Sequence, residues 1–321
     1  MTDSFLLTNP EERIKKQIEN IYESYSNPWD ILAELNQNAV DAIKEWEEKY
    51  EDIDRDHSID IRIERSSNSI IIEDTGIGIL PENLPDLLAP NATDKAGDIS
   101  TIGEKGVGLT YCIFCSNEFS IETKSPKGYY KAEINGARTW RERDTVDRVP
   151  GTENTARKVD EYDANETGTK IRIDDVQLAG GEEESIFQLS PARLKYLLQT
   201  KTAIGNTKAR FGADQPDIDV QLTIVGNNVE EFNENIEFEF YYPDKFWDEE
   251  EVVDIEDFEN RDDIGRMSDE QKNKYLGGKV WKAQGTTERN GKEIRYYALF
   301  VPSAKAWNRI AEQNGLTDQE G

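Results

Sequence analysis

Glu34-Leu35-Asn36-Gln37-Asn38-Ala39-Val40-Asp41-Ala42 is the stretch that decides the fold, together with three glycine-containing motifs that follow it along the chain. These motifs are Asp74-Thr75-Gly76-Ile77-Gly78-Ile79, Gly103-Glu104-Lys105-Gly106-Val107-Gly108 and Gly168-Thr169-Lys170-Ile171. Each motif alone is a weak signal, because short glycine clusters usually mark ordinary turns. Their fixed order along one chain is the informative feature.

The first motif lies in a pattern that predicts an amphipathic helix after Asn27-Pro28. One face of this helix carries Ile31, Leu35, Asn38, Ala42 and Trp46. Glu34 and Asn38 are neighbours one turn apart on such a helix. A carboxylate there can polarise an attacking water, and an amide oxygen can take one place around Mg²⁺. The alternative is a solvated helix face without chemistry.

The second motif places a carboxylate at the end of an expected strand. Asp74 follows the apolar run Ser69-Ile70-Ile71-Ile72-Glu73, and glycines at 76 and 78 allow close approach of the backbone. A carboxylate held there can accept a hydrogen bond from an exocyclic amine such as that of adenine. The alternative is a turn that ends a strand.

The third motif supplies glycines just before an apolar helix expected from near Leu109. Free backbone N–H groups at a helix N-terminus attract phosphate. The fourth motif, Gly168-Thr169, gains meaning only from its position after the other three, since it could be a turn before an alternating strand. Taken together, the four motifs predict a pocket for ATP.

This combination resembles the Bergerat-fold ATPases of the GHKL superfamily, which contains DNA gyrase B subunits, MutL mismatch-repair proteins, ninety-kilodalton heat-shock chaperones, microrchidia-type ATPases and histidine kinases. The resemblance covers roughly the first half to two thirds of the chain, the size of a domain. In wording, Tyr25-Ser26-Asn27 and Asp98-Ile99-Ser100-Thr101-Ile102-Gly103 are closest to the chaperones. The short lid with Asn91-Ala92-Thr93-Asp94-Lys95 is similar to those of MutL and microrchidia-type proteins.

The resemblance implies a role for each matching residue. Glu34 is implied to be the general base of ATP hydrolysis, Asn38 the Mg²⁺ ligand, and Lys95 a lid residue that meets the terminal phosphate. Asp74 would bind the adenine amine, with Thr169 sharing a bridging water beside it. The other residues expected to contact the nucleotide are Asp41, Gly76, Gly78, Ile79, Gly103, Lys105, Gly106, Val107, Gly108 and Leu109.

Lys201 lies in a second local likeness. Gln199-Thr200-Lys201-Thr202-Ala203-Ile204-Gly205-Asn206 resembles the lysine loop with which gyrase-type second domains contact the γ-phosphate. Here the segment falls at the end of an expected helix inside the first domain. The alternative is an exposed helix C-terminus, where a lysine suits the helix dipole.

Composition bounds the class of protein. The 321 residues carry 38 Lys+Arg against 66 Asp+Glu, a net charge of −28. Such a surface repels nucleic acid, so DNA contact is expected only through a local patch or a partner; the charge also fits a solubility adaptation, including one to high salt. Neither a membrane span nor a secretory signal is visible, which predicts a soluble, cytoplasmic protein. Cys112 and Cys115 are expected to be buried core thiols, with a redox pair as the alternative.

The periodicities predict an α+β fold: a two-layer sandwich with a mixed, largely antiparallel sheet and helices on one face. Expected helices beyond the two above span 11–22, 192–202 and 303–312. Expected strands span 59–63, 69–72, 119–123, 129–134, 218–225, 236–242, 279–284 and 294–300. We expect 138–166 to be an exposed polar loop and 247–263 a solvated acidic segment. Residues 1–226 are predicted as the ATP-binding domain, and 227–321 as an acidic segment and the start of a second, transducer-like or middle domain of a longer protein.

Three functional classes are compatible with this pocket. The first, which we expect, is an Mg-dependent ATPase that works as a conformational clamp, closes as an ATP-dependent homodimer, and serves a nucleic-acid-directed, DNA-repair or antiviral-defence system with an effector partner. The alternative is a heat-shock-type chaperone, which the motif wording favours and the short lid and short chain disfavour. A histidine kinase needs a phosphoacceptor histidine before the ATP domain, and the single histidine, His57, follows Glu34.

Overall fold

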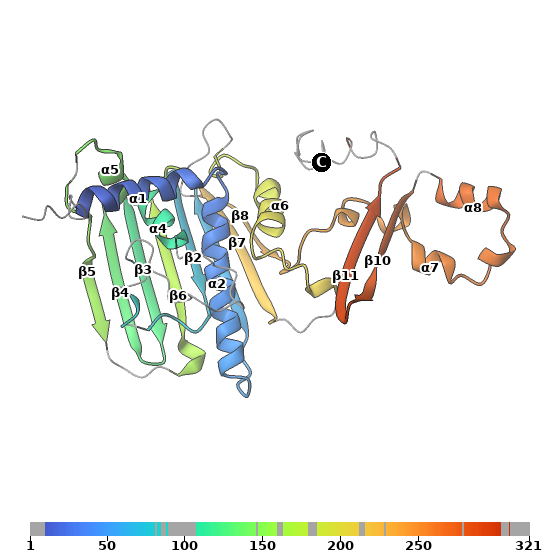
Figure 1. Ribbon diagram of the computed structural model, residues 1–321, viewed down its shortest axis with the longest axis horizontal. Coiled ribbons are helices and arrows are strands. Elements are labelled where there is room, and N and C mark those ends of the chain that lie inside the picture. Colours follow the sequence, from blue (N-terminus) through green and yellow to red (C-terminus); the bar gives the residue numbers. More distant parts are fainter. Residues whose placement is uncertain are drawn as a thin grey trace, which may run out of the picture. The chain divides into compact units, whose positions relative to one another are not determined.

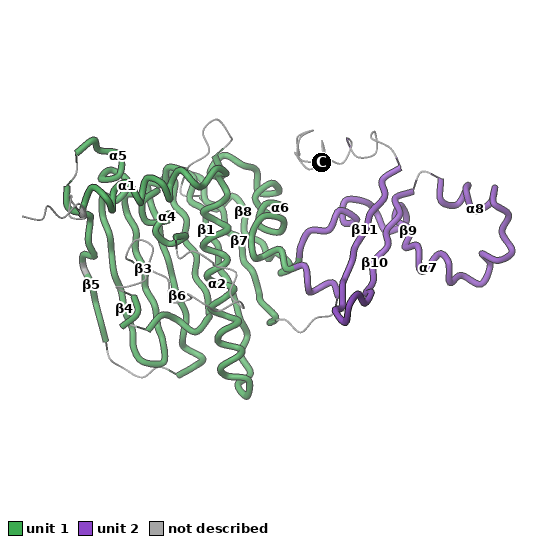
Figure 2. The backbone as a smooth tube through the Cα atoms, viewed as in Figure 1, with its two compact units in different colours: residues 1–206, 214–239 green, residues 207–213, 240–321 purple. Residues whose placement is uncertain are grey.

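The computed structural model describes residues 10–80, 82–84, 88, 107–145, 147–158, 163–178, 185–211, 216–227, 229–277, 279–302 and 308. The chain forms two compact units, residues 1–206 with 214–239 and residues 207–213 with 240–321 (Figure 2). Strand β8 (Val229–Ile236) pairs with β7 (Ile218–Gly226), so it lies in the first unit although it follows residue 226. The assignment of functions to domains stays a prediction.

The first unit is built on one mixed sheet. Within the described residues its eight strands follow the order β5-β4-β3-β6-β2-β1-β7-β8 (Figure 1). The strands other than β7 and β8 are β1 (His57–Glu64), β2 (Ser69–Asp74), β3 (Glu118–Ser125), β4 (Gly128–Asn135), β5 (Glu153–Lys158) and β6 (Gly168–Asp174). Neighbouring strands run antiparallel except β1 and β7, which are parallel. The predicted, largely antiparallel sheet is confirmed.

Helices cover one face of this sheet. They are α1 (Pro10–Ser24), α2 (Asp30–Lys49), α4 (Gly108–Phe114), α5 (Ala137–Glu142) and α6 (Pro191–Lys201), with a 3₁₀ turn, η1 (Ala164–Glu166). Figure 1 shows α1, α2 and α4 lying along the sheet. Alternate strand residues such as Ile59 and Ile61 are buried in one apolar cluster with Leu35 and Ile43 of α2. Burying each such side chain stabilises the fold by about 1.5–3 kcal/mol, and the predicted two-layer sandwich is confirmed.

Two parts of the first unit differ from the sequence-based expectation. The polar stretch 138–166 contains most of α5, the edge strand β5 and the 3₁₀ turn η1, where we expected a loop. The strand expected at 236–242 lies instead at Val229–Ile236. Both strands are largely exposed along their length, so they lack the apolar alternation that marks a half-buried strand.

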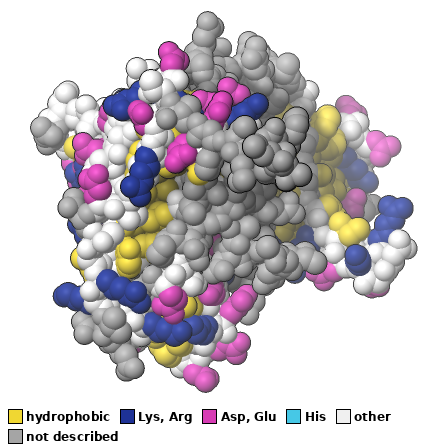
Figure 3. Space-filling model, turned by 60° about the vertical axis from the view of Figure 1, so that its left-hand side comes forward, with side chains coloured by type: hydrophobic (Ala, Val, Ile, Leu, Met, Phe, Trp, Pro, Cys, Tyr) yellow, Lys and Arg dark blue, Asp and Glu magenta, His cyan; other side chains and the backbone are white. Residues whose placement is uncertain are grey.

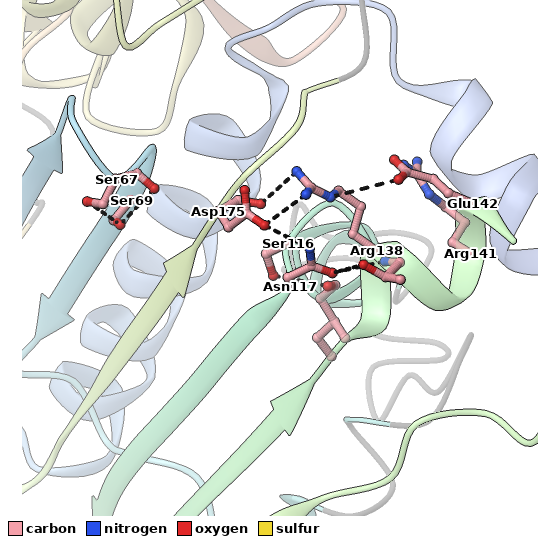
Figure 4. Close-up of polar contacts among 10 residues, drawn as sticks. Ser67, Ser69, Ser116, Asn117, Arg138, Arg141, Glu142 and Asp175 are labelled. Carbon is pink, nitrogen blue, oxygen red and sulfur yellow. Dashed lines mark hydrogen bonds and ion pairs between the residues drawn. The ribbon is translucent and has the colours of Figure 1, made fainter.

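A polar cluster fixes the junction between α4, β3, α5 and the end of β6 (Figure 4). Arg138 of α5 donates hydrogen bonds to the Asp175 carbonyl (3.0 Å) and carboxylate (2.8 Å). Asn117 donates to the same carboxylate (2.7 Å) and accepts from the Thr139 backbone (2.9 Å). The Ser116 hydroxyl bonds back to the Cys112 carbonyl (3.2 Å), which anchors the last turn of α4.

The helix α4 also carries both cysteines. Cys112 and Cys115 are free and buried, as predicted for core thiols. Burial raises the pKa of both thiols, which keeps them protonated. In the described part of the chain, His, Cys, Asp and Glu do not gather in a group of three that could hold a metal ion. No helix among those residues is long and apolar enough to span a bilayer.

The second unit is smaller and contains a three-stranded sheet of order β11-β10-β9 within the described residues. Its elements are η2 (Ala209–Phe211), η3 (Pro243–Phe246), η4 (Glu249–Glu251), β9 (Val252–Asp254), α7 (Ile255–Glu259), η5 (Ile264–Arg266), α8 (Asp269–Leu276), β10 (Val280–Arg289) and β11 (Lys292–Phe300). Trp247, Val253 and Phe258 are buried. The acidic stretch expected to be a solvated loop is therefore anchored by these apolar side chains. The helix expected at 303–312 falls almost entirely outside the described residues.

Candidate functional site

The carboxylate of Glu34 lies between two elements of the first unit. Glu34 is in the second turn of α2, and the Tyr25 hydroxyl donates a hydrogen bond of 2.8 Å to its Oε1. Its Oε2 lies against Gly108 at the start of α4, where an added Cβ would approach to 1.9 Å. A side chain at position 108 would therefore displace the Glu34 carboxylate. The structure brings together the residues predicted as general base and as last glycine of the phosphate loop.

Burial governs the charge of this carboxylate. Partial burial raises the pKa of Glu34, the hydrogen bond from Tyr25 acts in the opposite direction, and the nearby charge of Asp30 raises it further. A carboxylic acid whose pKa is raised is a stronger base once it ionises, which suits proton transfer from a water molecule. The environment of Glu34 therefore fits the role that the sequence predicts for it.

The second carboxylate ends a row of polar side chains across the sheet. Asp74 of β2 pairs with Thr169 of β6, which pairs with Thr123 of β3. The Thr123 and Thr169 hydroxyls lie 3.1 Å apart, and Thr123 accepts from the Ile79 backbone N–H at 2.8 Å. All three side chains are buried. Strand register thus places Asp74 beside Thr169, and the Thr123 hydroxyl links this pair to Ile79.

Asp74 is a buried acid whose pKa is raised above its ordinary value. It is 8% exposed, and burial raises its pKa to about 7. Backbone hydrogen bonds from Gly76 (2.8 Å to Oδ1) and from Thr169 oppose this shift, as does the positive charge of Arg55. A carboxylate has about four lone-pair positions, so these two donors leave room for a further one. Asp74 can therefore accept from an amine.

Two glycines permit close backbone contacts beside Asp74. A Cβ at Gly76 would lie 2.6 Å from the carbonyl carbon of Ala42 in α2, and the next residue, Ile77, donates to the Ala42 carbonyl (3.0 Å). Gly78 adopts φ +71°, and a Cβ there would lie 1.8 Å from the Lys124 carbonyl oxygen. The loop after β2 is thus fitted against α2 on one side and β3 on the other.

A supporting layer under this loop was missed from the sequence. The Arg55 guanidinium donates to the carbonyls of Ala164 (2.9 Å) and Thr167 (2.8 Å). The Thr167 hydroxyl donates to the Gly76 carbonyl (2.7 Å), and the Trp46 indole N–H donates to Ala164 (2.9 Å). These partners are separated by about a hundred residues along the chain, so no local pattern signals them.

His57 belongs to the same layer. Its buried ring contacts Thr75 (3.2 Å) through Nδ1 and Glu47 of α2 (2.9 Å) through Nε2. Burial lowers the pKa of His57, which favours the neutral ring. The sequence singled out this histidine only to set aside a phosphoacceptor role, and the structure gives it a supporting position behind the Asp74 loop.

Some of the remaining predicted residues lie on described elements, and the others lie outside the described part of the chain. Asn38 is exposed on α2, and Asp41 is half-buried and accepts from Gln37 (2.8 Å). Val107 and Leu109 flank Gly108 and pack against the core. Lys201 is exposed at the end of α6. Four predicted site residues lie outside the described part of the chain: Lys95, Gly103, Lys105 and Gly106.

Charges of both signs are mixed on the described surface. Figure 3 shows Lys and Arg side chains interspersed with Asp and Glu on the face that it displays. Charged side chains of neighbouring strands form ion pairs, such as Lys170 of β6 with Glu73 of β2 (2.8 Å). Surface pairs of this kind contribute little stability, about 0–1 kcal/mol each. This face therefore gives no reason to revise the expectation that the net negative charge disfavours direct contact with DNA.

Comparison with known proteins finds a family and several relatives that are similar to this chain. The family described as histidine kinase-, DNA gyrase B- and HSP90-like ATPase matches residues 27–177. The chain is 26% identical over 223 residues to the DNA mismatch repair protein MutL of Herminiimonas arsenicoxydans, covering 66% of this chain and 30% of that protein. It is 32% identical over 126 residues to the chaperone protein HtpG of Fusobacterium nucleatum, covering 33% of this chain and 20% of that protein.

A second MutL, from Streptococcus uberis, is 28% identical over 217 residues, covering 64% of this chain and 27% of that protein. The chain thus spans less than a third of the length of these relatives. Its matched residues hold Glu34, Asp74, Gly108 and Thr169 on the elements described above. Through residues 27–177, the chain is similar to the family of histidine kinase-, DNA gyrase B- and HSP90-like ATPases, in agreement with the resemblance seen in the sequence.

Proposed function

We propose that this protein binds Mg-ATP and hydrolyses it, with Glu34 as the general base. The contact of Glu34 with Gly108 carries the proposal, because it brings a carboxylate from α2 to the last glycine of the proposed phosphate loop. A base must lie within hydrogen-bond reach of the water that it activates. Glu34 is half-buried and Asp74 is buried, and of these two carboxylates Glu34 is the one that lies against Gly108.

The opposite end of the nucleotide is assigned to the Asp74 region. Asp74 accepts from the exocyclic amine of adenine, and Thr169 shares a bridging water with it. Gly76, Gly78 and Ile79 shape this end of the pocket, and Asp41 lies beside the nucleotide. Two features of Asp74 support this assignment: its side chain is buried, and its carboxylate can accept a further hydrogen bond.

Asn38 is the residue assigned to Mg²⁺. Its amide is exposed on α2, one turn after Glu34, and an amide oxygen is a ligand that Mg²⁺ accepts in its octahedral shell. When bound, the ion neutralises phosphate charge. Gly103, Lys105, Gly106, Val107, Gly108 and Leu109 wrap the phosphates, and Lys95 meets the terminal one, as the resemblance implies.

The substitution Glu34→Gln tests the chemistry. We expect hydrolysis to fall by about 10²-fold or more, as for the loss of a positioned base, with ATP affinity nearly unchanged. Glu45→Gln is the matched control, because Glu45 is an exposed glutamate of the same helix. Single-turnover hydrolysis and calorimetric ATP binding separate the two effects. Wild-type turnover in Glu34→Gln would remove Glu34 from this role.

For the biological task we propose an ATP-gated clamp in a nucleic-acid-directed or defence system. The likeness to two proteins named for DNA mismatch repair supports it. The clamp would close as a homodimer on ATP, with DNA contact left to a partner because of the charge of −28. Sedimentation of the longest native chain with a non-hydrolysable ATP analogue, with and without DNA and partner, tests this. A chain that stays monomeric with the analogue rules out the clamp.

The second candidate is an ATP-dependent chaperone, which the likeness to HtpG favours. It predicts suppression of client aggregation that depends on ATP and is indifferent to nucleic acid. Light scattering of a heat-unfolded client protein, with Glu34→Gln as the ATPase-deficient control, distinguishes it from the clamp. ATP-dependent dimerisation that ignores DNA and partner would move this candidate ahead.

A further inference from the structure

We propose that Tyr25 is a positioning residue for Glu34, whose hydroxyl holds one carboxylate oxygen so that the other faces the start of α4. This inference rests on the proposed function, since it concerns how the general base is aimed. Tyr25 was noted in the sequence only as part of a motif, without a role of its own. Three elements carry the inference: the end of α1, the second turn of α2 and the first turn of α4.

The two oxygens of Glu34 have different surroundings. Oε1 accepts the 2.8 Å hydrogen bond from Tyr25, whereas Oε2 lies on the side of Gly108. A glutamate carboxylate rotates about its last side-chain bonds unless something fixes it. A hydrogen bond to an ionised oxygen is among the stronger ones and fixes the plane of the group. Tyr25 therefore determines which oxygen is presented toward the phosphate loop.

Tyr25 is itself held in place. Its ring stacks on the Tyr111 ring of α4, with centroids 3.9 Å apart and planes 17° from parallel. Tyr111 is 1% exposed. Tyr22, in the last turn of α1, has its ring centroid 6.0 Å from that of Tyr111. The Arg141 guanidinium stacks on the Tyr22 ring, 3.3 Å from its centroid. The phenol that aims Glu34 is thus anchored between α1 and α4.

Removing the Tyr25 hydroxyl should therefore affect the rate and leave binding alone. Tyr25→Phe keeps the ring that stacks on Tyr111 and removes only the donor to Glu34. Glu34 is still present but adopts several orientations, so we expect the hydrolysis rate to fall about 10-fold to 100-fold, the range of a lost hydrogen bond to a charged group. The affinity for ATP should stay within about 2-fold, since the hydroxyl contacts the base.

The test is a cycle of Tyr25→Phe, Glu34→Gln and the double variant, measured on the full chain. If Tyr25 acts through Glu34, the double variant hydrolyses ATP as slowly as Glu34→Gln alone. Tyr22→Phe is the matched control: its hydroxyl is directed to the Gln177 carbonyl (3.5 Å), so turnover should be unchanged. Wild-type turnover in Tyr25→Phe, or an equal further loss in the Glu34→Gln background, overturns the inference.

A second measurement tests the contact between Tyr25 and Glu34 without catalysis. The near-ultraviolet absorption of a tyrosine shifts when its hydroxyl loses a charged acceptor. We expect a tyrosine difference band between the ATP-free wild type and Glu34→Gln, and no such band between Tyr25→Phe and the double variant; a band of equal size in both pairs contradicts the contact. If Glu34→Gln hydrolyses ATP normally, the proposed function fails; if only Tyr25→Phe behaves as wild type, only this inference fails.

Discussion

Glu34 and Asp74 are two sheltered carboxylates that the protein holds in different ways. The Glu34 carboxylate ends a long side chain, and its two oxygens contact the Tyr25 hydroxyl and Gly108. The Asp74 carboxylate ends a short side chain at the end of a strand, and it accepts hydrogen bonds from the backbone N–H groups of Gly76 and Thr169. The first carboxylate is held by contacts with other elements of the fold, whereas the second is held by backbone groups next to it and across the sheet.

This difference matches the two tasks proposed for them. A base must lie within hydrogen-bond reach of the attacking water, so a carboxylate that a neighbouring hydroxyl aims in one direction is suitable. Recognition of a nucleobase requires an acceptor at a constant place, and backbone donors provide that rigidity. The proposed base is thus oriented by a side chain, and the proposed acceptor for adenine is held by the backbone.

The largest test of this contrast compares two glycines. In Gly76→Ala the new Cβ would meet the backbone of Ala42 at 2.6 Å, so α2 and the loop must separate. We expect the free energy of unfolding to fall by about 3 kcal/mol. In Gly108→Ala the Cβ would meet only the end of the Glu34 side chain, so stability should change by less than about 1 kcal/mol while hydrolysis falls about 100-fold.

Urea unfolding and single-turnover hydrolysis measure the two effects. Gly151→Ala is the control, because a Cβ there meets nothing within 4 Å. Equal losses of stability at 76 and 108 would show that both regions are equally rigid, and the contrast between them would disappear.

Asp74→Asn should weaken ATP binding and strengthen the fold. The amide offers one acceptor oxygen and a donor in place of the carboxylate, so we expect affinity for ATP to fall by about 1–3 kcal/mol. Without a charge to bury, the ATP-free protein should be about 2 kcal/mol more stable at pH 8. Calorimetry and chemical unfolding give the two numbers, with Glu73→Gln, a change at the exposed neighbour in β2, as control. Unchanged affinity would remove Asp74 from adenine recognition.

The pH dependence of stability should report the same acid. The folded pKa of about 7 lies above the ordinary value of 3.8. Between these values the folded protein retains a proton that the unfolded chain has lost, so stability falls as pH rises from about 4 to about 7 and levels off above that. The stability difference between Asp74→Asn and wild type should grow over the same range. A constant difference from pH 4 to pH 8 would contradict the shift.

The smallest expected effect is at Thr123, which joins the polar row to the loop. Thr123→Val removes the hydroxyl that accepts from Ile79 and contacts Thr169 but keeps the shape of the side chain. We expect a loss of stability of about 1 kcal/mol and hydrolysis within about 2-fold of wild type, since Glu34 is not touched. Thermal unfolding and turnover check this, and a loss of turnover with unchanged stability would show that the two carboxylates are coupled.

The fold could be predicted from the sequence wherever burial leaves a period. Apolar residues recur with the helical period in α2, alternate with polar ones in β1 and form a short run in β2, and these elements lie where expected. β5 reads Glu153-Asn154-Thr155-Ala156-Arg157-Lys158 and lies at the edge of the sheet, so nothing in its composition indicates a strand. The acidic stretch was misjudged because Trp247, Val253 and Phe258 are spaced too far apart to form a period.

The site follows the same division. Glu34, Asp74, Gly108 and Thr169 belong to short motifs, so local spacing was enough to select them. Tyr25 meets Glu34 because α1 ends against α4, and Arg55 meets Thr167 across 112 residues of chain. Such contacts are set by packing, which a single sequence does not display. The assignments of individual residues to ATP stay predictions for the experiments above.

The helix α2 also sets the distance between Glu34 and the loop that follows Asp74. Glu34 is on its second turn and Ala42, against which the Asp74 loop is fitted, comes eight residues later. At a rise of 1.5 Å per residue the two regions are separated by about 12 Å along the helix axis. A ligand that engages both must have that reach, so a nucleoside or a free phosphate could satisfy one region and leave the other empty. One residue inserted between them would turn Glu34 by about 100° relative to Ala42 and would lengthen their separation by about 1.5 Å. The direction of the Glu34 side chain and its distance from the loop would therefore change together.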